Sequence, residues 1–250
     1  HNSVEAQIAT LTPLQREEAS KVTAYQVLMP SFVDKAKKLL NTDIYYIPNV
    51  VNPIPDNAIA DLSADKTIYK IIMIGRIDRY QKRSLIAIKS FLEIAAHFPN
   101  WELHFYGPIT DSKYKKEIDE YIESHDLHHQ VIYEGITDNS IGVLHDADIF
   151  AFPSAFEGFG LALTEANSMG VPAVGFSSAP AINELIEDNV TGFLAKDERD
   201  FTQKLSALMK DKKMRIQMGK AAHQAMNKYS PDEVWGMWLR LLNRLVAENK

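Results

Sequence analysis

The chain has 250 residues, of which 46% are hydrophobic and 24% are charged, so it is long enough to bury a substantial core. Its formal net charge of −6 argues against a chain-wide attraction for nucleic acid, and no nucleic-acid partner is expected. The absence of cysteine excludes disulfide bonds and thiolate metal sites and fits a cytoplasmic protein. No run of about 18 apolar residues occurs, so no transmembrane segment is expected.

Short elements are predicted in the part of the chain before Tyr69, where a regular alternation of strands and helices begins. A helix is expected over Pro13–Ala24, because proline is favoured in the first turn of a helix. The run Val27–Pro30 predicts a short strand, and Ser31 is a candidate cap for a helix over Ser31–Leu40. The run Ile44–Pro55 predicts a strand that leads into a proline-rich connection, which is the best linker candidate in the chain.

From Tyr69 onward, apolar runs alternate regularly with helical segments. The runs lack polar alternation, which is typical of strands buried on both faces of a parallel sheet. We therefore predict an α/β fold, a Rossmann-like parallel sheet with helices on both faces. The predicted strands are Tyr69–Ile74, Glu102–Tyr106, Val131–Glu134, Ile149–Pro153, Ala173–Phe176 and Gly192–Leu194, and the helices between them are Ser84–His97, Ser112–Ser124, Ile141–Asp146, Gly160–Met169 and Ile182–Glu187.

Helical patterns also close the chain, over Phe201–Met209, Met214–Lys228 and Asp232–Asn249. The last of these has apolar residues at helical spacing, so it needs a surface to cover. Either this domain or a partner domain supplies that surface. The apolar residues are Trp235, Trp238, Leu239, Leu242 and Leu245.

Ligands of open α/β sheets bind at the carboxyl ends of the strands, so the residues that follow each strand are the best candidates for a binding site. Gly75 lets the chain turn off the first predicted strand, and Arg76 and Lys82 follow it. A guanidinium fork and an ammonium group both suit phosphate oxygens. The alternative is a solvated basic loop. Glycines also follow the next two strands, at Gly107 and Gly135.

The segment 150–176 places Glu157 and Glu165 around a Gly-Phe-Gly turn between two apolar runs. Such a turn presents backbone N–H groups and a helix N-terminus, which attract anions and phosphate above all. Carboxylates do not bind phosphate but suit hydroxyl groups, so the expected ligand carries both phosphate and sugar. The alternatives are that Glu157 balances the helix dipole and that Glu165 is an ordinary surface carboxylate.

These pieces together resemble the C-terminal, nucleotide-sugar-binding domain of retaining GT-B glycosyltransferases, the glycosyl transferases group 1 (family 4-like). The resemblance runs in order through IPNVVNP, IGRIDRYQK, LHFYGP, VIYEGI, ADIFAFPSAFEGFGLALTEANSMGVPAVGF and NELIEDNVTGFLA, over about Ile44–Lys228. It implies one half of a GT-B fold that transfers sugar from a nucleotide-diphospho-sugar to a glycan or lipid-linked acceptor, in cell-surface polysaccharide synthesis.

The resemblance also implies roles for single residues. Arg76 and Lys82 hold the donor diphosphate, Glu157 contacts the hydroxyl groups of the donor sugar, and these three form the catalytic set. Glu165 binds the ribose. Further donor-binding positions are Gly75, Gly158, Phe159, Gly160 and Leu161 around sugar and phosphate, with Gly107 and Ile136 beside the base.

Sugar transfer leaves negative charge on the β-phosphate, and fixed cations and N–H dipoles stabilise it. Because Arg76, Lys82 and the helix start offer these groups, we expect no essential metal and no cofactor. By resemblance, UDP is the commonest donor base, with GDP and ADP behind it, and the anomeric configuration is retained. The enzyme would act in the cytoplasm, at most peripherally on the inner membrane face.

Enzymes of this fold have two such domains, and the acceptor binds mostly to the N-terminal one. We therefore expect residues 1–45 to be a remnant of the N-terminal domain and linker, 46–228 the donor-binding domain, and 229–250 a helix packing back toward the missing domain. His1 in place of Met is interpreted as a sign of a fragment, a processed chain or a cloning remnant.

Two other functions remain open at this stage. One is a glycan phosphorylase of related fold, although no convincing lysine context for pyridoxal phosphate is found. The other is a nucleotide-sugar-binding module without turnover. The cluster His125–His129 is interpreted as exposed loop histidines rather than a metal site, because its spacing is irregular. His104 is expected to be a satisfied, partly buried histidine.

Overall fold

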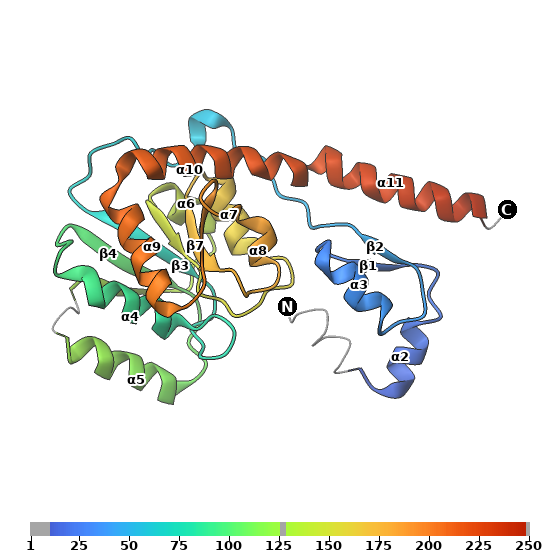
Figure 1. Cartoon of the computed structure of the whole chain (residues 1–250), viewed down its shortest axis with the longest axis horizontal. Coiled ribbons are helices and arrows are strands. Elements are labelled where there is room, and N and C mark those ends of the chain that lie inside the picture. The colour runs from blue at the N-terminus through green and yellow to red at the C-terminus, as the bar shows by residue number, and fades with distance from the viewer. Residues whose placement is uncertain (1–10, 126–128, 249–250) are drawn as a thin grey trace.

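The computed structural model describes residues 11–125 and 129–248, which form a large α/β domain and a smaller unit beside it (Figure 1). His1 and Asn2, on which the interpretation of a fragment partly depends, lie outside the described residues. So do residues 126–128, the middle of the histidine cluster.

The α/β domain is built on a six-stranded, wholly parallel sheet with the strand order β5-β4-β3-β6-β7-β8. The chain adds strands outward from β3 in one direction, then returns to the other side of β3 and adds them in the opposite direction. This is the doubly wound order, and it confirms the predicted fold class. The strands are β3 (Tyr69–Ile74), β4 (Trp101–Tyr106), β5 (Val131–Gly135), β6 (Ile149–Ala151), β7 (Ala173–Phe176) and β8 (Gly192–Ala195).

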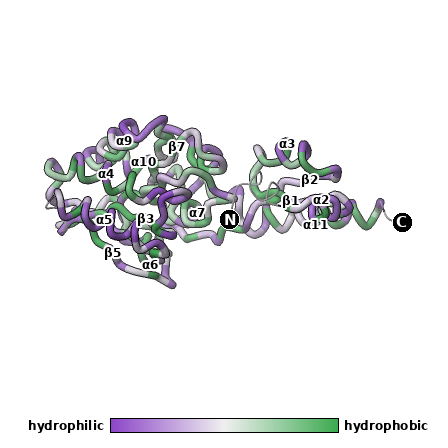
Figure 2. Tube along the Cα trace, turned by 90° about the horizontal axis from the view of Figure 1, so that it is seen from below, coloured by the Kyte–Doolittle hydropathy of each residue, from purple (hydrophilic) through white to green (hydrophobic). Residues whose placement is uncertain are grey.

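Helices cover both faces of this sheet, as predicted (Figure 1). One face carries α4 (Ser84–Ala95), α5 (Ser112–Glu123) and α9 (Glu198–Lys210), and the other carries α6 (Ser140–His145), α7 (Leu161–Ser168) and α10 (Lys212–Ala225). The short helix α8 (Ile182–Leu185) packs beside β7 and α7. In Figure 2 the chain is mainly hydrophobic at strand β7 and mainly hydrophilic along the outer helix α5.

Every element predicted for the α/β domain is present, and its ends differ from the prediction by three residues or fewer. The differences have local causes. Strand β6 ends at Ala151 rather than Pro153, because proline has no N–H for the ladder. Helix α10 ends at Ala225, and the chain tightens into the 3₁₀ turn Met226–Tyr229 before the next helix starts at Pro231.

The smaller unit contains α2 (Pro13–Ala19), β1 (Tyr25–Val27), α3 (Ser31–Lys37) and β2 (Ile44–Tyr46), with β1 and β2 parallel. Two predictions were wrong here. Helix α2 is shorter than expected because the residues after it bind the α3–β2 connection, for example through the Thr42 hydroxyl, which donates to the Val22 carbonyl at 2.6 Å. The strand is Tyr25–Val27 rather than Val27–Pro30, because only Tyr25–Val27 pairs with β2.

The predicted cap of α3 was also wrong. Pro30 occupies the N-cap position, and Ser31 instead donates its hydroxyl to Glu184 Oε1 at 2.5 Å. Glu184 lies on α8 of the α/β domain, so this contact joins the two units. A second joint is formed by the side chains of Tyr46 and Tyr229, which interact with each other, and burial raises the pKa of both hydroxyl groups.

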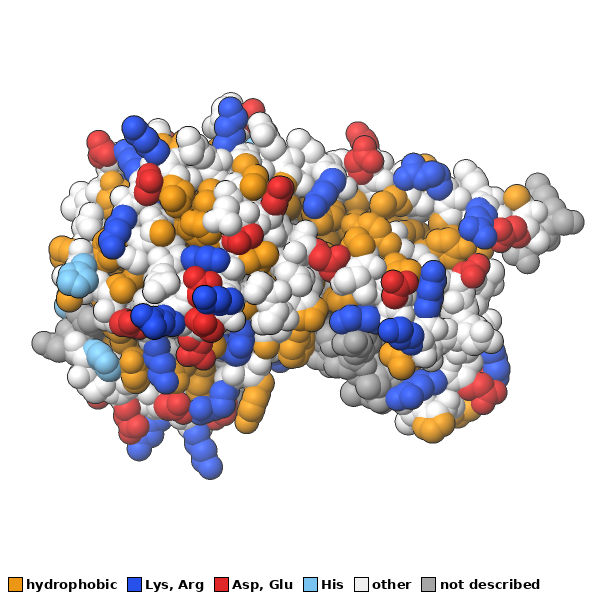
Figure 3. Space-filling view, in the orientation of Figure 1, with side chains coloured by type: hydrophobic (Ala, Val, Ile, Leu, Met, Phe, Trp, Pro, Cys, Tyr) orange, Lys and Arg blue, Asp and Glu red, His pale blue; other side chains and the backbone are white. Residues whose placement is uncertain are grey.

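The long helix α11 (Pro231–Glu248) leaves the α/β domain and passes over the smaller unit (Figures 1 and 3). Its buried residues Val234 and Leu241 pack on Ile47, with Trp238 and Leu245 beside them. A second apolar row on the same helix stays more than half exposed: Trp235, Leu239, Leu242 and Val246. The predicted stripe is therefore only partly covered within the described residues.

Two glycines, Gly75 and Gly107, allow the backbones to approach each other closely at the carboxyl ends of β3 and β4. A side chain at Gly107 would place its Cβ 2.0 Å from the Gly75 carbonyl oxygen, and Gly107 has a φ of +145°. Beyond the strands the two segments continue side by side, with the Ile77 N–H donating to the Pro108 carbonyl at 2.9 Å. Gly107 therefore fixes the path of the loop that follows β3.

We expect Gly107→Ala to lower the free energy of unfolding by about 2 kcal/mol or more, because the new Cβ meets backbone in a left-handed conformation. Urea denaturation followed by circular dichroism measures this. Gly236→Ala is the matched control: its Cβ would meet only the flexible Arg240 side chain on α11, so a gain of about 0.5–1 kcal/mol is expected. Equal effects of the two changes would contradict the argument that the backbones at Gly75 and Gly107 lie too close together to admit a side chain.

Candidate functional site

A cavity of about 360 Å³ opens where the strand order reverses, at the carboxyl ends of β3 and β6. Open α/β sheets bind their ligands at this point. Residues of both units line the cavity: Leu28 and Asn49 from the smaller unit and linker, and Arg76, Gln81, Lys82, Glu157, Phe159, Gly160, Leu161 and Ala162 from the α/β domain. Three of these side chains are charged, and all three were predicted from the sequence.

The loop after β3 is folded around one carboxylate. Asp78 Oδ1 accepts hydrogen bonds from the N–H groups of Tyr80, Gln81 and Lys82, at 2.9, 2.7 and 3.1 Å. Arg76 donates from Nη2 to Gln81 Oε1 at 2.8 Å, while more than half of its side chain remains exposed. The loop therefore presents the Arg76 guanidinium at the mouth of the cavity and turns Lys82 inward.

Lys82 and Glu157 form an ion pair inside the cavity, with 2.6 Å between Nζ and Oε1. The side chains are 14% and 6% exposed, so the pair is largely withdrawn from water. The Lys82 ammonium also lies 4.8 Å from the centre of the Phe152 ring. Its stem passes over Gly75, where a Cβ would come within 3.0 Å of Lys82 Cε. Gly75 thus leaves the room that Lys82 needs to reach Glu157.

The segment between β6 and α7 supplies backbone groups to the same cavity. Gly160 has a φ of +85° at the N-cap of α7, with no side-chain cap. The first amides of a helix have no acceptor within it, so Leu161 and Ala162, which line the cavity, offer N–H groups there. The Phe159 ring is buried edge-on against Tyr229, with ring centres 5.3 Å apart, and anchors this turn.

Not all of the predicted positions meet at the cavity. Gly158 is buried next to it, and Glu165 is half-buried on α7, one turn beyond Leu161. Neither lines the cavity. Gly107 packs against Gly75, and Ile136 is 76% exposed after β5. These last two do not line the cavity either; they directly follow β4 and β5.

Sequence reasoning missed several lining residues. Gln81 lies between two predicted cations in the sequence, and its carbonyl accepts from the Ala155 N–H at 2.7 Å. Leu28 and Asn49 come from the smaller unit and its connection. Asn49 stands in the run IPNVVNP, so a signal existed for it, whereas nothing in the sequence marked Leu28.

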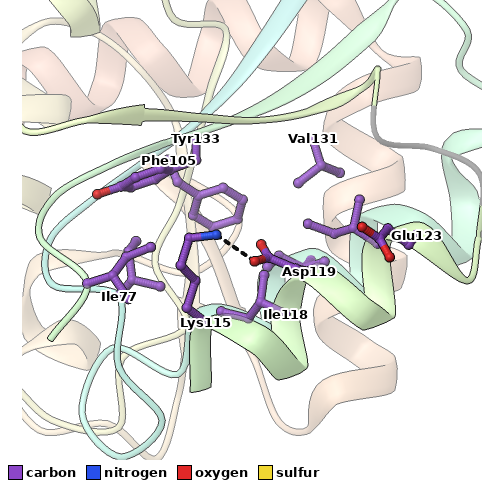
Figure 4. Close-up of a pocket in the computed structure, with 11 residues that line it drawn as sticks. Ile77, Phe105, Lys115, Ile118, Asp119, Glu123, Val131 and Tyr133 are labelled. Carbon is purple, nitrogen blue, oxygen red and sulfur yellow. Dashed lines mark hydrogen bonds and ion pairs between the residues drawn. The ribbon is translucent and has the colours of Figure 1, made fainter. Parts of the chain in front are cut away.

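A second cavity, of about 290 Å³, lies between α5 and the sheet (Figure 4). Its walls are mainly aliphatic and aromatic, including Ile77, Phe105 and Ile118, and the Lys115–Asp119 ion pair lies at 2.5 Å along α5. None of the predicted site residues lines it. The cavity around Lys82, in contrast, contains the charged residues predicted at the carboxyl ends of the strands, and it is therefore the candidate site.

Among residues 11–125 and 129–248, no group of three or more His, Asp or Glu side chains is arranged to hold a metal ion. His104 is buried and lies between two carboxylates, with 2.8 Å to Glu134 and 2.9 Å to Glu102, which explains its place inside a strand. Over the same residues, no helix combines the length and apolar character needed to cross a membrane.

Comparison with known proteins finds a match to the family model of glycosyl transferases group 1 over residues 56–225. A poly(glycerol-phosphate) α-glucosyltransferase from Bacillus subtilis (strain 168) is 28% identical over 205 residues, which is 81% of this chain and 29% of the relative. The chain thus spans less than a third of that protein.

Solved structures show the same architecture. A mutant of Staphylococcus aureus TarM, crystallised in complex with fondaparinux, α-GlcNAc-glycerol and UDP, has a TM-score of 0.80 at 24% identity over 92% of this chain and 46% of its own. The C-terminal domain of a glycosyl transferase group 1 family protein (LpcC) from Francisella tularensis has a TM-score of 0.61 at 26% identity, covering 73% of this chain and 97% of that domain.

The Lys82–Glu157 pair is expected to stabilise the fold only as a pair. Lys82→Met leaves a buried carboxylate without its cation and should lower the free energy of unfolding by about 2 kcal/mol. The double variant Lys82→Met/Glu157→Gln should lose less than the sum of the single changes, with a coupling of at least about 1 kcal/mol in urea denaturation. Additive single effects would show that the two side chains do not interact in solution.

Proposed function

The chain belongs to the glycosyl transferases group 1 family, and we propose that it is the donor-binding part of a retaining glycosyltransferase. In this proposal the cavity around Lys82 holds a nucleotide-diphospho-sugar, and the sugar passes to a glycan or lipid-linked acceptor in cell-surface polysaccharide synthesis. The observation that supports the proposal is the contact between Lys82 and Glu157 at the strand-order reversal, which places a cation suited to phosphate beside a carboxylate suited to sugar hydroxyls.

The geometry supports a separate role for each of the groups that line the cavity. Arg76 at the mouth and Lys82 inside hold the diphosphate oxygens, and the first amides of α7 face the same space. Glu157 accepts hydrogen bonds from the sugar hydroxyls. As the bond from sugar to phosphate breaks, the two cations and the amides stabilise the charge on the departing β-phosphate without a metal ion. Glu165, one turn further along α7, contacts the ribose.

The relatives support the donor and the stereochemistry. The B. subtilis relative is named as an α-glucosyltransferase acting on poly(glycerol-phosphate), and the TarM structure contains UDP. An α-linked product is the outcome of retention when the donor is an α-linked nucleotide sugar. We therefore propose a UDP-sugar donor, retention, and a polyol-phosphate or lipid-linked acceptor reached from the cytoplasm.

We further propose that a second domain completes the enzyme. The smaller unit is a single βαβ piece with a two-stranded parallel sheet, which is too small to bury both of its own faces. Beside it, Trp235, Leu239, Leu242 and Val246 of α11 are 52–60% exposed in one row. The solved TarM chain is about twice as long as the part that matches. The domain that covers this row would carry the acceptor site.

Arg76→Ala is expected to weaken binding of UDP and of UDP-glucose by about tenfold or more, since a charged hydrogen bond to the diphosphate is lost. Isothermal titration calorimetry in EDTA measures both affinities and also tests the metal-free proposal. UDP-N-acetylglucosamine, GDP and ADP are titrated in parallel to identify the donor class.

Arg79→Ala provides the control for this experiment, because Arg79 stands in the same loop but donates to Glu117 at 3.2 Å and does not line the cavity. Its removal should leave the nucleotide affinity within about twofold. Equal weakening by the two changes would indicate a diffuse charge effect, and no binding of any nucleotide by the wild-type protein would reject the proposed function.

This 250-residue chain is expected to bind the donor yet transfer sugar at no more than about one thousandth of the rate of a longer chain that includes the proposed second domain. Transfer from radiolabelled UDP-sugar to poly(glycerol-phosphate) measures the two rates. Comparable turnover by the 250-residue chain would refute the need for a second domain.

A further inference from the structure

The segment that carries Glu157, residues 152–160, has no regular secondary structure, yet most of its residues are buried. Buried backbone outside helices and sheets needs partners for its N–H and C=O groups, and unpaired groups are costly. The partners of this segment therefore determine how firmly the Glu157 carboxylate is held.

Three consecutive residues after β3 supply many of these partners. Gln81 accepts from the Ala155 N–H at 2.7 Å through its carbonyl, and Lys82 pairs with the Glu157 side chain. Arg83 donates from Nε to the Pro153 carbonyl at 2.8 Å and from Nη2 to the Ser154 carbonyl at 3.3 Å. Each of the three residues after β3 thus contacts the segment that carries Glu157 directly.

Arg83 itself is held in a costly conformation. It has a φ of 49° and a ψ of 45°, the left-handed region that favours glycine, and it precedes the first residue of α4. Its guanidinium packs over the Phe176 ring at 4.5 Å, and the side chain is half-buried. Glycine would suit this left-handed backbone better than arginine. The start of α4 alone therefore does not explain why a guanidinium group stands at this position.

We propose that Arg83 is a positioning residue of the site: its guanidinium fixes the Pro153 and Ser154 carbonyls and thereby holds the Glu157 carboxylate against Lys82. This rests on the proposed function for the role of Glu157 toward the sugar. Arg83 does not line the cavity. It acts through the buried segment, and its effect should fall on recognition of the sugar rather than of the nucleotide.

The first arm of the test needs no ligand. Arg83→Gly removes the guanidinium and suits the left-handed backbone, so the variant should fold. Amide hydrogen exchange is measured at Ala155 and Glu157, with the Phe152 amide, which donates to Val174 in the sheet, as internal control. The expected result is that exchange at Ala155 and Glu157 accelerates about tenfold more than at Phe152. Equal acceleration at all three amides would overturn the proposal, because it would mean a general loss of stability.

Arg83→Lys tests the donor geometry in the same assay. Lysine keeps the positive charge and the strained backbone but lacks the planar fork that reaches two carbonyls. It should restore part of the protection at Ala155 that glycine loses. If lysine protects as well as arginine, the two-carbonyl contact is irrelevant and the proposed geometry is wrong. If lysine protects no better than glycine, the planar fork is essential, which supports the proposed geometry.

The second arm measures affinity for UDP, UDP-glucose and UDP-N-acetylglucosamine by calorimetry. Arg83→Gly should reduce the preference for the UDP-sugar over UDP about fivefold, while the affinity for UDP stays within about twofold. An unchanged preference would overturn the positioning role. If the wild-type protein binds none of these nucleotides, the proposed function fails, and the exchange arm still decides whether Arg83 holds the segment.

Discussion

The ion pair between Lys82 and Glu157 is the contact on which the arrangement of the site depends. Its partners are 75 positions apart in the chain, and they meet because the strand order places β3 beside β6. Either charge alone would be unfavourable in a space where both side chains are almost fully withdrawn from water. Together they bind the loop after β3 to the segment after β6, and so they define the width of the cavity between the two halves of the sheet.

The backbone around this pair is shaped to allow it. Gly107 has no side chain, which lets the chain leave β3 close to the end of β4, and Gly75 leaves room for the stem of Lys82. Asp78 then gathers three amides and turns the loop inward. On the facing side, Gly160 takes a left-handed conformation that starts α7 at the cavity. Glycines placed where φ is positive are thus as important for the site as the charged side chains that they orient.

Sequence reasoning was most successful where one physical signal dominated. Apolar runs marked the six central strands because burial on both faces leaves no polar alternation, and the strands' carboxyl ends then pointed to Arg76, Lys82 and Glu157. It failed where tertiary contacts decide. The strand at Tyr25–Val27 is fixed by its pairing with β2, and Ser31 binds Glu184 of another unit rather than its own helix. Leu28 reaches the cavity only because the two units pack together.

The charges of the cavity narrow the kind of ligand that fits it. Its lining carries two cations, Arg76 and Lys82, and one carboxylate, Glu157, so it is locally positive in a chain of net charge −6. A neutral sugar alone would not require two cations, and the N-terminus of α7 adds further attraction for an anion. A simple anion, however, would be repelled by Glu157 unless an uncharged group with hydroxyl donors separated them. This distribution of charge is the one that the proposed nucleotide-diphospho-sugar would match, with its phosphates toward Arg76 and Lys82 and its sugar hydroxyls toward Glu157.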